Sequence, residues 1–185
     1  YQLSLPMTDG WQAGGDGLLF DFLDDARTQP DAYPDTFITS GFAEGVITIN
    51  VLEADDVART VAQTELRERY RTLLGHFRHE SGHYYWSLLS GDGMETSLFA
   101  EVFGDANIEY RSSLGVYYRE GPPADWEQRH ISAYASSHPL EDWAETWSHY
   151  LLMHDALETA HAHGLIDTPP LASTFVERIL SLIHI

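Results

Sequence analysis

The sequence predicts an α+β fold in which strands come first and helices follow. Short β-type segments bounded by Gly, Pro, Asp or Ser fill the first fifty residues, and longer stretches with helical periodicity fill the rest. The 185 residues are 43% apolar and include 5 Trp, 10 Tyr and 8 Phe, which is enough to build a packed core. Strands and helices that are segregated along one chain are typical of the α+β class.

Three strands are predicted, at residues 17–22, 35–39 and 45–51. Each segment is enriched in β-branched or aromatic residues and ends at residues that favour turns. The third segment, Gly45 to Val51, contains the most β-branched residues and is the clearest of the three.

Helices are predicted after residue 55. Asp55 and Asp56 form an acidic N-terminal signal for a helical region that runs to about residue 90. Shorter helices are expected at about 95–103 and 106–119. Pro at a first helical position predicts a long helix from Pro139 to about residue 162, with Gly164 as its stop.

Charge and composition exclude several functions. The formal net charge of −19 argues against nucleic acid and anionic membranes as partners, because a polyanion would be repelled. Since the chain has no cysteine, any metal must be bound by histidine and carboxylate. No apolar run approaches the length of a membrane span, and no signal peptide is visible. We therefore expect a cytoplasmic protein, while its oligomeric state stays open.

The pattern His79-Glu80-Ser81-Gly82-His83 indicates a hydrolytic metal site. Histidines four apart on a helix face the same way and can hold one ion, usually zinc, with the glutamate between them placed as a general base. Such a pattern also arises by chance in a chain with 10 histidines, so its context matters. Apolar residues around it approximate a buried helical stripe: Tyr70, Leu73, Leu74, Phe77, Tyr84 and Leu88.

A catalytic zinc site needs a third protein ligand. If a helix begins at Pro139, Glu141 lies in its first turn and Glu145 one turn further on the same face. The two carboxylates suit a ligand with an orienting partner. An acidic first turn that only complements the helix dipole is the alternative. His138 and His149 are competing ligands.

Two stretches, residues 75–86 and 134–145, resemble the bacterial zinc-binding metallopeptidases of the Mx type. Residues 18–23 and 45–50 also fit, so the resemblance covers nearly the whole chain. It implies a zincin-like fold, with a small N-terminal β-sheet packed on an active-site helix and a mostly helical C-terminal half.

The resemblance also bears on the two ends of the chain. We expect a single domain over residues 1–179 that is an N-terminally truncated fragment, because the sequence begins at Tyr1 without an initiator methionine. The family commonly carries an N-terminal zinc ribbon with paired cysteines, and its absence here is consistent with truncation. Residues 180–185 resemble a translated sequencing adapter and are expected to be a non-native tail.

A broader similarity to gluzincins implies the remaining roles. Their third ligand is a glutamate in an ExxA pattern followed by an acid, and in the branch similar to anthrax lethal factor a tyrosine lies seven residues earlier. Residues 141–145 and Tyr134 match both features. Without the resemblance, Tyr134 reads as a core tyrosine. The implied site holds one Zn²⁺ and comprises the ligands His79, His83 and Glu141, the general base Glu80, the oxyanion donor Tyr134, and Glu145, which orients a ligating histidine.

The implied activity is zinc-dependent hydrolysis of peptide bonds in a peptide or protein substrate. In zincins an edge strand pairs with the substrate backbone, and residues 46–51 are the expected edge strand. A di-iron carboxylate protein is the first alternative, since Glu80-x-x-His83 and Glu158-x-x-His161 both have the required spacing. The β-rich first fifty residues disfavour it. A non-catalytic zinc-binding module is the second alternative, and the intact Glu80 disfavours that.

Overall fold

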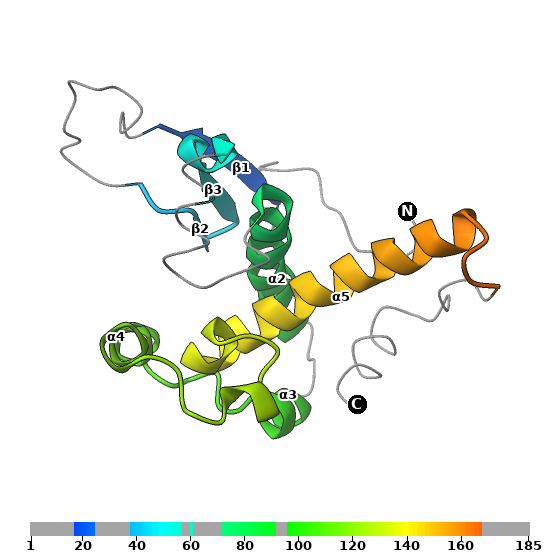
Figure 1. Ribbon diagram of the computed structural model, residues 1–185. Helices are drawn as coiled ribbons and strands as arrows, with labels where there is room; N and C mark the ends of the chain where they lie inside the picture. Colours follow the sequence, from blue (N-terminus) through cyan, green and yellow to red (C-terminus); the bar gives the residue numbers. More distant parts are fainter. Residues whose placement is uncertain (1–16, 25–37, 57–59, 61–71, 92–95, 168–185) are drawn as a thin grey trace. The chain divides into compact units, whose positions relative to one another are not determined.

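The computed structural model describes residues 17–24, 38–56, 60, 72–91 and 96–167 (Figure 1). These residues divide into two compact units, an N-terminal unit of residues 17–84 and a C-terminal unit of residues 85–167. Strands precede helices along the chain, so the predicted α+β class is confirmed. A single domain over residues 1–179 stays a prediction, and the tail at residues 180–185 lies outside the described residues.

A three-stranded sheet forms the first part of the N-terminal unit. It consists of β1 (Leu19–Leu23), β2 (Gly41–Ala43) and β3 (Val46–Asn50) in the order β1-β3-β2. β1 runs parallel to β3, and β2 runs antiparallel to it. Glu44 and Gly45 join β2 to β3 with φ angles of 48° and 81°, as a type I′ hairpin turn requires. A Cβ at Gly45 would lie 2.8 Å from the carbonyl oxygen of Gly17, so this turn favours glycine.

Within the same unit, the sheet packs on the first part of α2 (Leu73–Gly91) (Figure 1). The ring of Phe77 on α2 lies 5.7 Å from that of Phe20 and 6.1 Å from that of Phe22, centroid to centroid. Ile47 and Ile49 alternate along β3 and are almost completely buried, because alternate residues of a strand share one face. The predicted arrangement of a small sheet on the helix of His79 is confirmed.

The second predicted strand, residues 35–39, was wrong at the two of its residues that the structure describes. Residues 35–37 lie outside the described part of the chain, Ile38 and Thr39 are not in a strand, and the hairpin partner of β3 is Gly41–Ala43 instead. Asn-Gly and Asp-Gly are the usual signals for this turn and Glu-Gly is not, so β propensity at 37–39 dominated the prediction. As a consequence, β3 is paired on both sides. The expectation that residues 46–51 form the edge strand was therefore wrong as well.

A short 3-10 helix, η1 (Val51–Ala54), follows β3 directly. Asn50 caps it, since the Asn50 side chain accepts a hydrogen bond from the backbone N–H of Leu52 at 2.9 Å. Of the predicted helix over residues 56–90, the structure describes helical residues at 56, 60 and 73–91, while 57–59 and 61–71 lie outside the described residues.

The C-terminal unit contains the last turns of α2 and five further helical segments. These are α3 (Thr96–Val102), α4 (Tyr110–Glu120), η2 (Trp126–Gln128), η3 (Tyr134–Ser137) and α5 (Pro139–Ala162). Aromatic side chains form its core: Tyr85 stacks on Trp147 at 4.8 Å, and Trp86 lies 5.9 Å from Trp143, between ring centroids. α4 begins four residues later than predicted, because Glu109 accepts from two backbone N–H groups and caps the helix.

α5 has the bounds that the sequence predicts. His138 is its N-cap, Pro139 occupies the first turn, and Gly164, with a φ of 67°, follows the last turn. Among the helices of the described residues, none combines the length and the apolar character that a membrane span requires.

Candidate metal centre

His79 and His83 face each other across one turn of α2. Their Nε2 atoms are 3.3 Å apart, and His79 is only 8% exposed. Two Zn–N bonds of about 2.0–2.1 Å in tetrahedral geometry place the two nitrogens about 3.3–3.4 Å apart. The pair therefore has the separation that a single zinc ion needs.

Glu80 lies between the two histidines in sequence and is 4% exposed. Its Oε1 is 3.3 Å from Nε2 of His76, and Nδ1 of His76 is 2.5 Å from Oε2 of Glu53. Burial lowers the pKa of His76, but hydrogen bonds and negative charge from Glu53 and Glu80 outweigh burial and raise the pKa to about 9. At neutral pH the imidazole is therefore protonated and donates to both carboxylates.

In the C-terminal unit, Glu141 is completely buried in the first turn of α5. The hydroxyl of Tyr110 donates a 2.5 Å hydrogen bond to its Oε1. Burying a carboxylate is costly unless a cation or several donors stabilise it. Complete burial therefore argues against an acidic first turn that is merely solvated, and suits a metal ligand.

Tyr134 begins η3 in the same unit and is partly buried. Its ring lies 5.8 Å from that of Tyr117, centroid to centroid. Burial, and then the negative charge of Glu141, raise the pKa of Tyr134 far above its ordinary value. The phenol therefore keeps its proton at neutral pH and can donate a hydrogen bond.

The other predicted and competing residues also lie on or next to α5. Oε2 of Glu145 accepts a 2.7 Å hydrogen bond from the Ser132 hydroxyl. His138 uses both ring nitrogens: Nδ1 accepts from the N–H of Leu140, and Nε2 donates to a backbone carbonyl. It is a helix cap and does not suit a ligand. His149 donates through Nδ1 to the carbonyl of Glu145 at 2.8 Å, as ligating histidines often do, and stays a competing ligand.

Sequence reasoning missed three polar contacts around these residues: His76 with Glu53, Tyr110 with Glu141, and His130 with Asp142. Burial raises the pKa of Asp142, while the His130 hydrogen bond acts in the opposite direction. Of these residues, only His76 could have been found from the sequence. It precedes Glu80 by four residues and shares its helix face, which indicates a contact between the two side chains. Their partners come from distant parts of the chain, which spacing cannot reveal.

The second Glu-x-x-His pattern lies on an exposed part of α5. His161 is exposed and donates to the carbonyl of Ile166 at 3.2 Å, and the carboxylate of Glu158 is 3.8 Å from Nδ1 of His154. Di-iron bundles project both of their Glu-x-x-His pairs into a buried interior. The exposure of His161 therefore disfavours the di-iron alternative.

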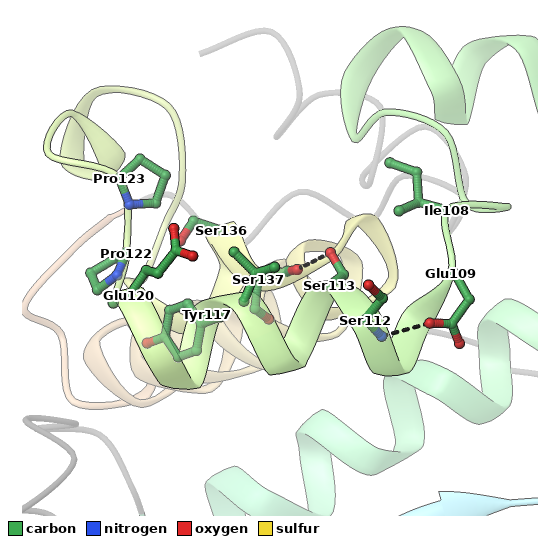
Figure 2. Close-up of a pocket in the computed structure, with 12 residues that line it drawn as sticks. Ile108, Glu109, Ser112, Ser113, Tyr117, Glu120, Pro122, Pro123, Ser136 and Ser137 are labelled. Carbon is green, nitrogen blue, oxygen red and sulfur yellow. Dashed lines mark hydrogen bonds between the residues drawn. The ribbon is translucent and has the colours of Figure 1, made fainter.

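A pocket of about 520 Å³ lies in the C-terminal unit beside the segment that begins with Tyr134 (Figure 2). Its lining comes from α4, from the two prolines after α4 and from η3: Ile108, Glu109, Ser112, Ser113, Val116, Tyr117, Glu120, Gly121, Pro122, Pro123, Ser136 and Ser137. Figure 2 shows the Ser113 hydroxyl donating to the Ser137 carbonyl, at 2.7 Å. The buried hydroxyl of Ser137 has no hydrogen-bond partner among the described residues.

An α+β fold with two facing histidines on a helix, of which His79 is buried, is typical of a metal-binding protein, and comparison with known proteins agrees. The sequence model of the family described as "Putative zinc-binding metallo-peptidase" matches residues 1–183, so the chain belongs to this family. The predicted family membership is confirmed. The closer likeness to anthrax lethal factor stays a prediction.

Similar chains include uncharacterized proteins from two strains of Mycobacterium tuberculosis and one from Mycobacterium bovis. Each is 43% identical over 176 residues, which are 95% of this chain and 48% of the relative. The chain thus spans about half the length of the curated relatives it matches. No solved structure matches it.

Proposed function

We propose that this chain is a zinc-dependent metallopeptidase of the gluzincin type, with one zinc held by His79, His83 and Glu141. The observation that carries the proposal is the 3.3 Å separation of the two histidine Nε2 atoms on a largely buried helix face. Membership of a zinc-binding metallopeptidase family supports zinc as the ion and peptide hydrolysis as the reaction.

Three observations support Glu141 as the third ligand. It matches the gluzincin pattern, it is completely buried, and a tyrosine hydroxyl holds one of its oxygens.

The remaining residues have chemical roles in this proposal. Bound zinc would lower the pKa of water toward neutrality and polarise the substrate carbonyl. Glu80 would take a proton from the attacking water and deliver it to the leaving amine. Tyr134 would donate to the oxyanion that develops on the carbonyl, which its raised pKa permits at neutral pH. Glu145 would orient a ligating histidine.

A peptide or protein is the substrate class of this proposal. The pocket beside η3 would hold a substrate side chain close to the scissile bond, because its wall residue Tyr117 contacts Tyr134. Its mixture of apolar walls and serine hydroxyls suits a side chain with a polar end. A cytoplasmic location belongs to the proposal and rests on the sequence.

The direct test is hydrolysis of a library of internally quenched fluorogenic peptides by the full chain. Zinc-loaded protein should cleave some of them, and the metal-free protein should not. Glu80→Gln should keep its zinc and lose about 10²- to 10⁴-fold in rate, as loss of acid–base catalysis does. If the parent protein binds zinc but cleaves no peptide of the library, a non-catalytic zinc-binding module is favoured.

A further inference from the structure

The N-terminal unit contains a chain of hydrogen bonds that ends on Glu80. The Ser40 hydroxyl accepts from the backbone N–H of Asn50 at 2.9 Å and donates to Oε1 of Glu53 at 2.6 Å. Oε2 of the same carboxylate accepts from Nδ1 of His76 at 2.5 Å. Nε2 of His76 faces Oε1 of Glu80 at 3.3 Å. The chain links the loop before β2, the turn after β3 and the helix face of the proposed base.

We propose that Ser40, Glu53 and His76 are positioning residues that fix the carboxylate of Glu80 for proton transfer. This inference rests on the proposed function, in which Glu80 is the general base. It assigns a task to residues that neither ligate zinc nor touch substrate.

Geometry explains why a base on this helix needs such support. A glutamate side chain has three rotatable torsions, and proton transfer requires a reach of about 2.6–3.2 Å to the proton that is abstracted. His76 lies one turn before Glu80 and holds one of its oxygens, which gives the other oxygen a defined direction. A displacement of about 1 Å can cost about 10²-fold in rate. Holding the carboxylate in one rotamer therefore has a direct kinetic value.

Hydrogen bonds from further residues fix His76 and Glu53 in turn. An imidazole can rotate about its side-chain torsions, but a carboxylate on Nδ1 fixes its ring plane and directs Nε2. Glu53 is fixed in turn, because Ser40 engages its other oxygen. Ser40 and Asn50 lie at the start and end of the β2–β3 hairpin, so the chain is anchored on the most regular part of the unit.

A structural ion pair that only ties η1 to α2 would have the same contacts. The two roles differ in what they predict for Glu80. If His76 acts through the Glu80 carboxylate, removing that carboxylate makes His76 irrelevant to the rate, whereas a purely structural role lowers the rate in either background.

The test is a double-mutant cycle in the full chain on a fluorogenic peptide that the parent cleaves. His76→Ala should lower kcat by about 10- to 100-fold with little change in KM or in zinc affinity, measured by chelator competition. In the Glu80→Gln background, the same substitution should change kcat by less than about 2-fold. His76→Gln, whose amide can still donate to Glu80, should retain more activity than His76→Ala. Leu74→Ala is the matched control and should have parental kcat, because Leu74, which the sequence placed in the buried stripe, is 57% exposed in the structure.

A second readout needs no catalysis. In metal-free protein labelled with ¹⁵N-histidine, the Nδ1 proton of His76 should give a slowly exchanging, strongly downfield NMR signal, which Glu53→Ala should abolish. If the parent shows no such Nδ1 proton signal, the proposed chain of hydrogen bonds through His76 is wrong. An active parent in which His76→Ala lowers kcat equally in both backgrounds would overturn the positioning role alone. A parent protein that cleaves no peptide would overturn both the proposed function and the positioning role of Ser40, Glu53 and His76.

Discussion

Replacing His76 should remove a pH-dependent part of the stability of the metal-free protein. The pKa of this imidazole is raised from 6.5 to about 9, because Glu53 and Glu80 favour its charged form more than burial opposes it. The folded state therefore binds the proton more tightly than the unfolded chain does. The resulting stabilisation is complete below about pH 6.5, declines as the pH rises and is lost above about pH 9.

The size of the effect follows from the shift. One pKa unit corresponds to about 1.4 kcal/mol, so the raised pKa of His76 represents at most roughly 3.5 kcal/mol of unfolding free energy. The His76 side chain keeps 16% of its surface exposed, and solvent screening reduces this figure, so we expect about 1–3 kcal/mol. Urea unfolding of the parent and of His76→Gln, with chelator at about pH 6 and about pH 9.5, measures it.

The difference in unfolding free energy between parent and His76→Gln should be larger at the lower pH by that amount. Replacement of the exposed His163 by Gln is the control and should leave the pH dependence of the parent unchanged. A parent–variant difference that is the same at both pH values, or larger at the higher one, would refute the assignment of a protonated His76 between two carboxylates.

Three further predictions concern the proposed site. Glu141→Ala should abolish zinc binding, whereas Glu145→Ala should weaken it by roughly 10- to 100-fold, and the opposite order of affinities would show that the wrong glutamate was chosen. Tyr134→Phe should keep both fold and zinc and lower kcat by roughly 10²- to 10³-fold, and parental turnover would exclude it as an oxyanion donor. Val116→Trp should narrow the pocket and lower kcat/KM by about 10-fold for peptides with bulky side chains near the scissile bond, while the zinc content stays unchanged. If the variant has the same peptide preference as the parent, the pocket is not part of the substrate site.

The sequence predicted an element correctly where residues at its two ends favour the start and the stop of a helix. Pro139 and Gly164 bounded α5 correctly, because a proline in the first turn and a glycine after the last turn act within a few residues. β2 was missed, since its strand is only three residues long and its Glu-Gly turn is an uncommon hairpin signal. The central place of β3 could not be predicted either, because strand order depends on contacts that are distant in sequence.

The same distinction holds for the site. His79 and His83 were predicted as a facing pair because a helix fixes the relation of residues four apart, and their Nε2 atoms do face each other. Tyr110 could not be predicted as a partner of Glu141, since 31 residues separate them in sequence. Glu53 and His76 are 23 residues apart, and only the packing of η1 beside α2 within the N-terminal unit brings them together.

Zinc-edge X-ray absorption on the reloaded full chain tests the proposed ligand set of the metal site. We expect one zinc per chain with two imidazole nitrogens and additional oxygen ligands at about 2.0–2.2 Å, with no thiolate sulfur since the chain has no cysteine. The imidazole contribution should fall by half in His83→Ala if that variant still binds zinc. A chain that retains no zinc after reloading, or a site whose imidazole count is unchanged in His83→Ala, would contradict it.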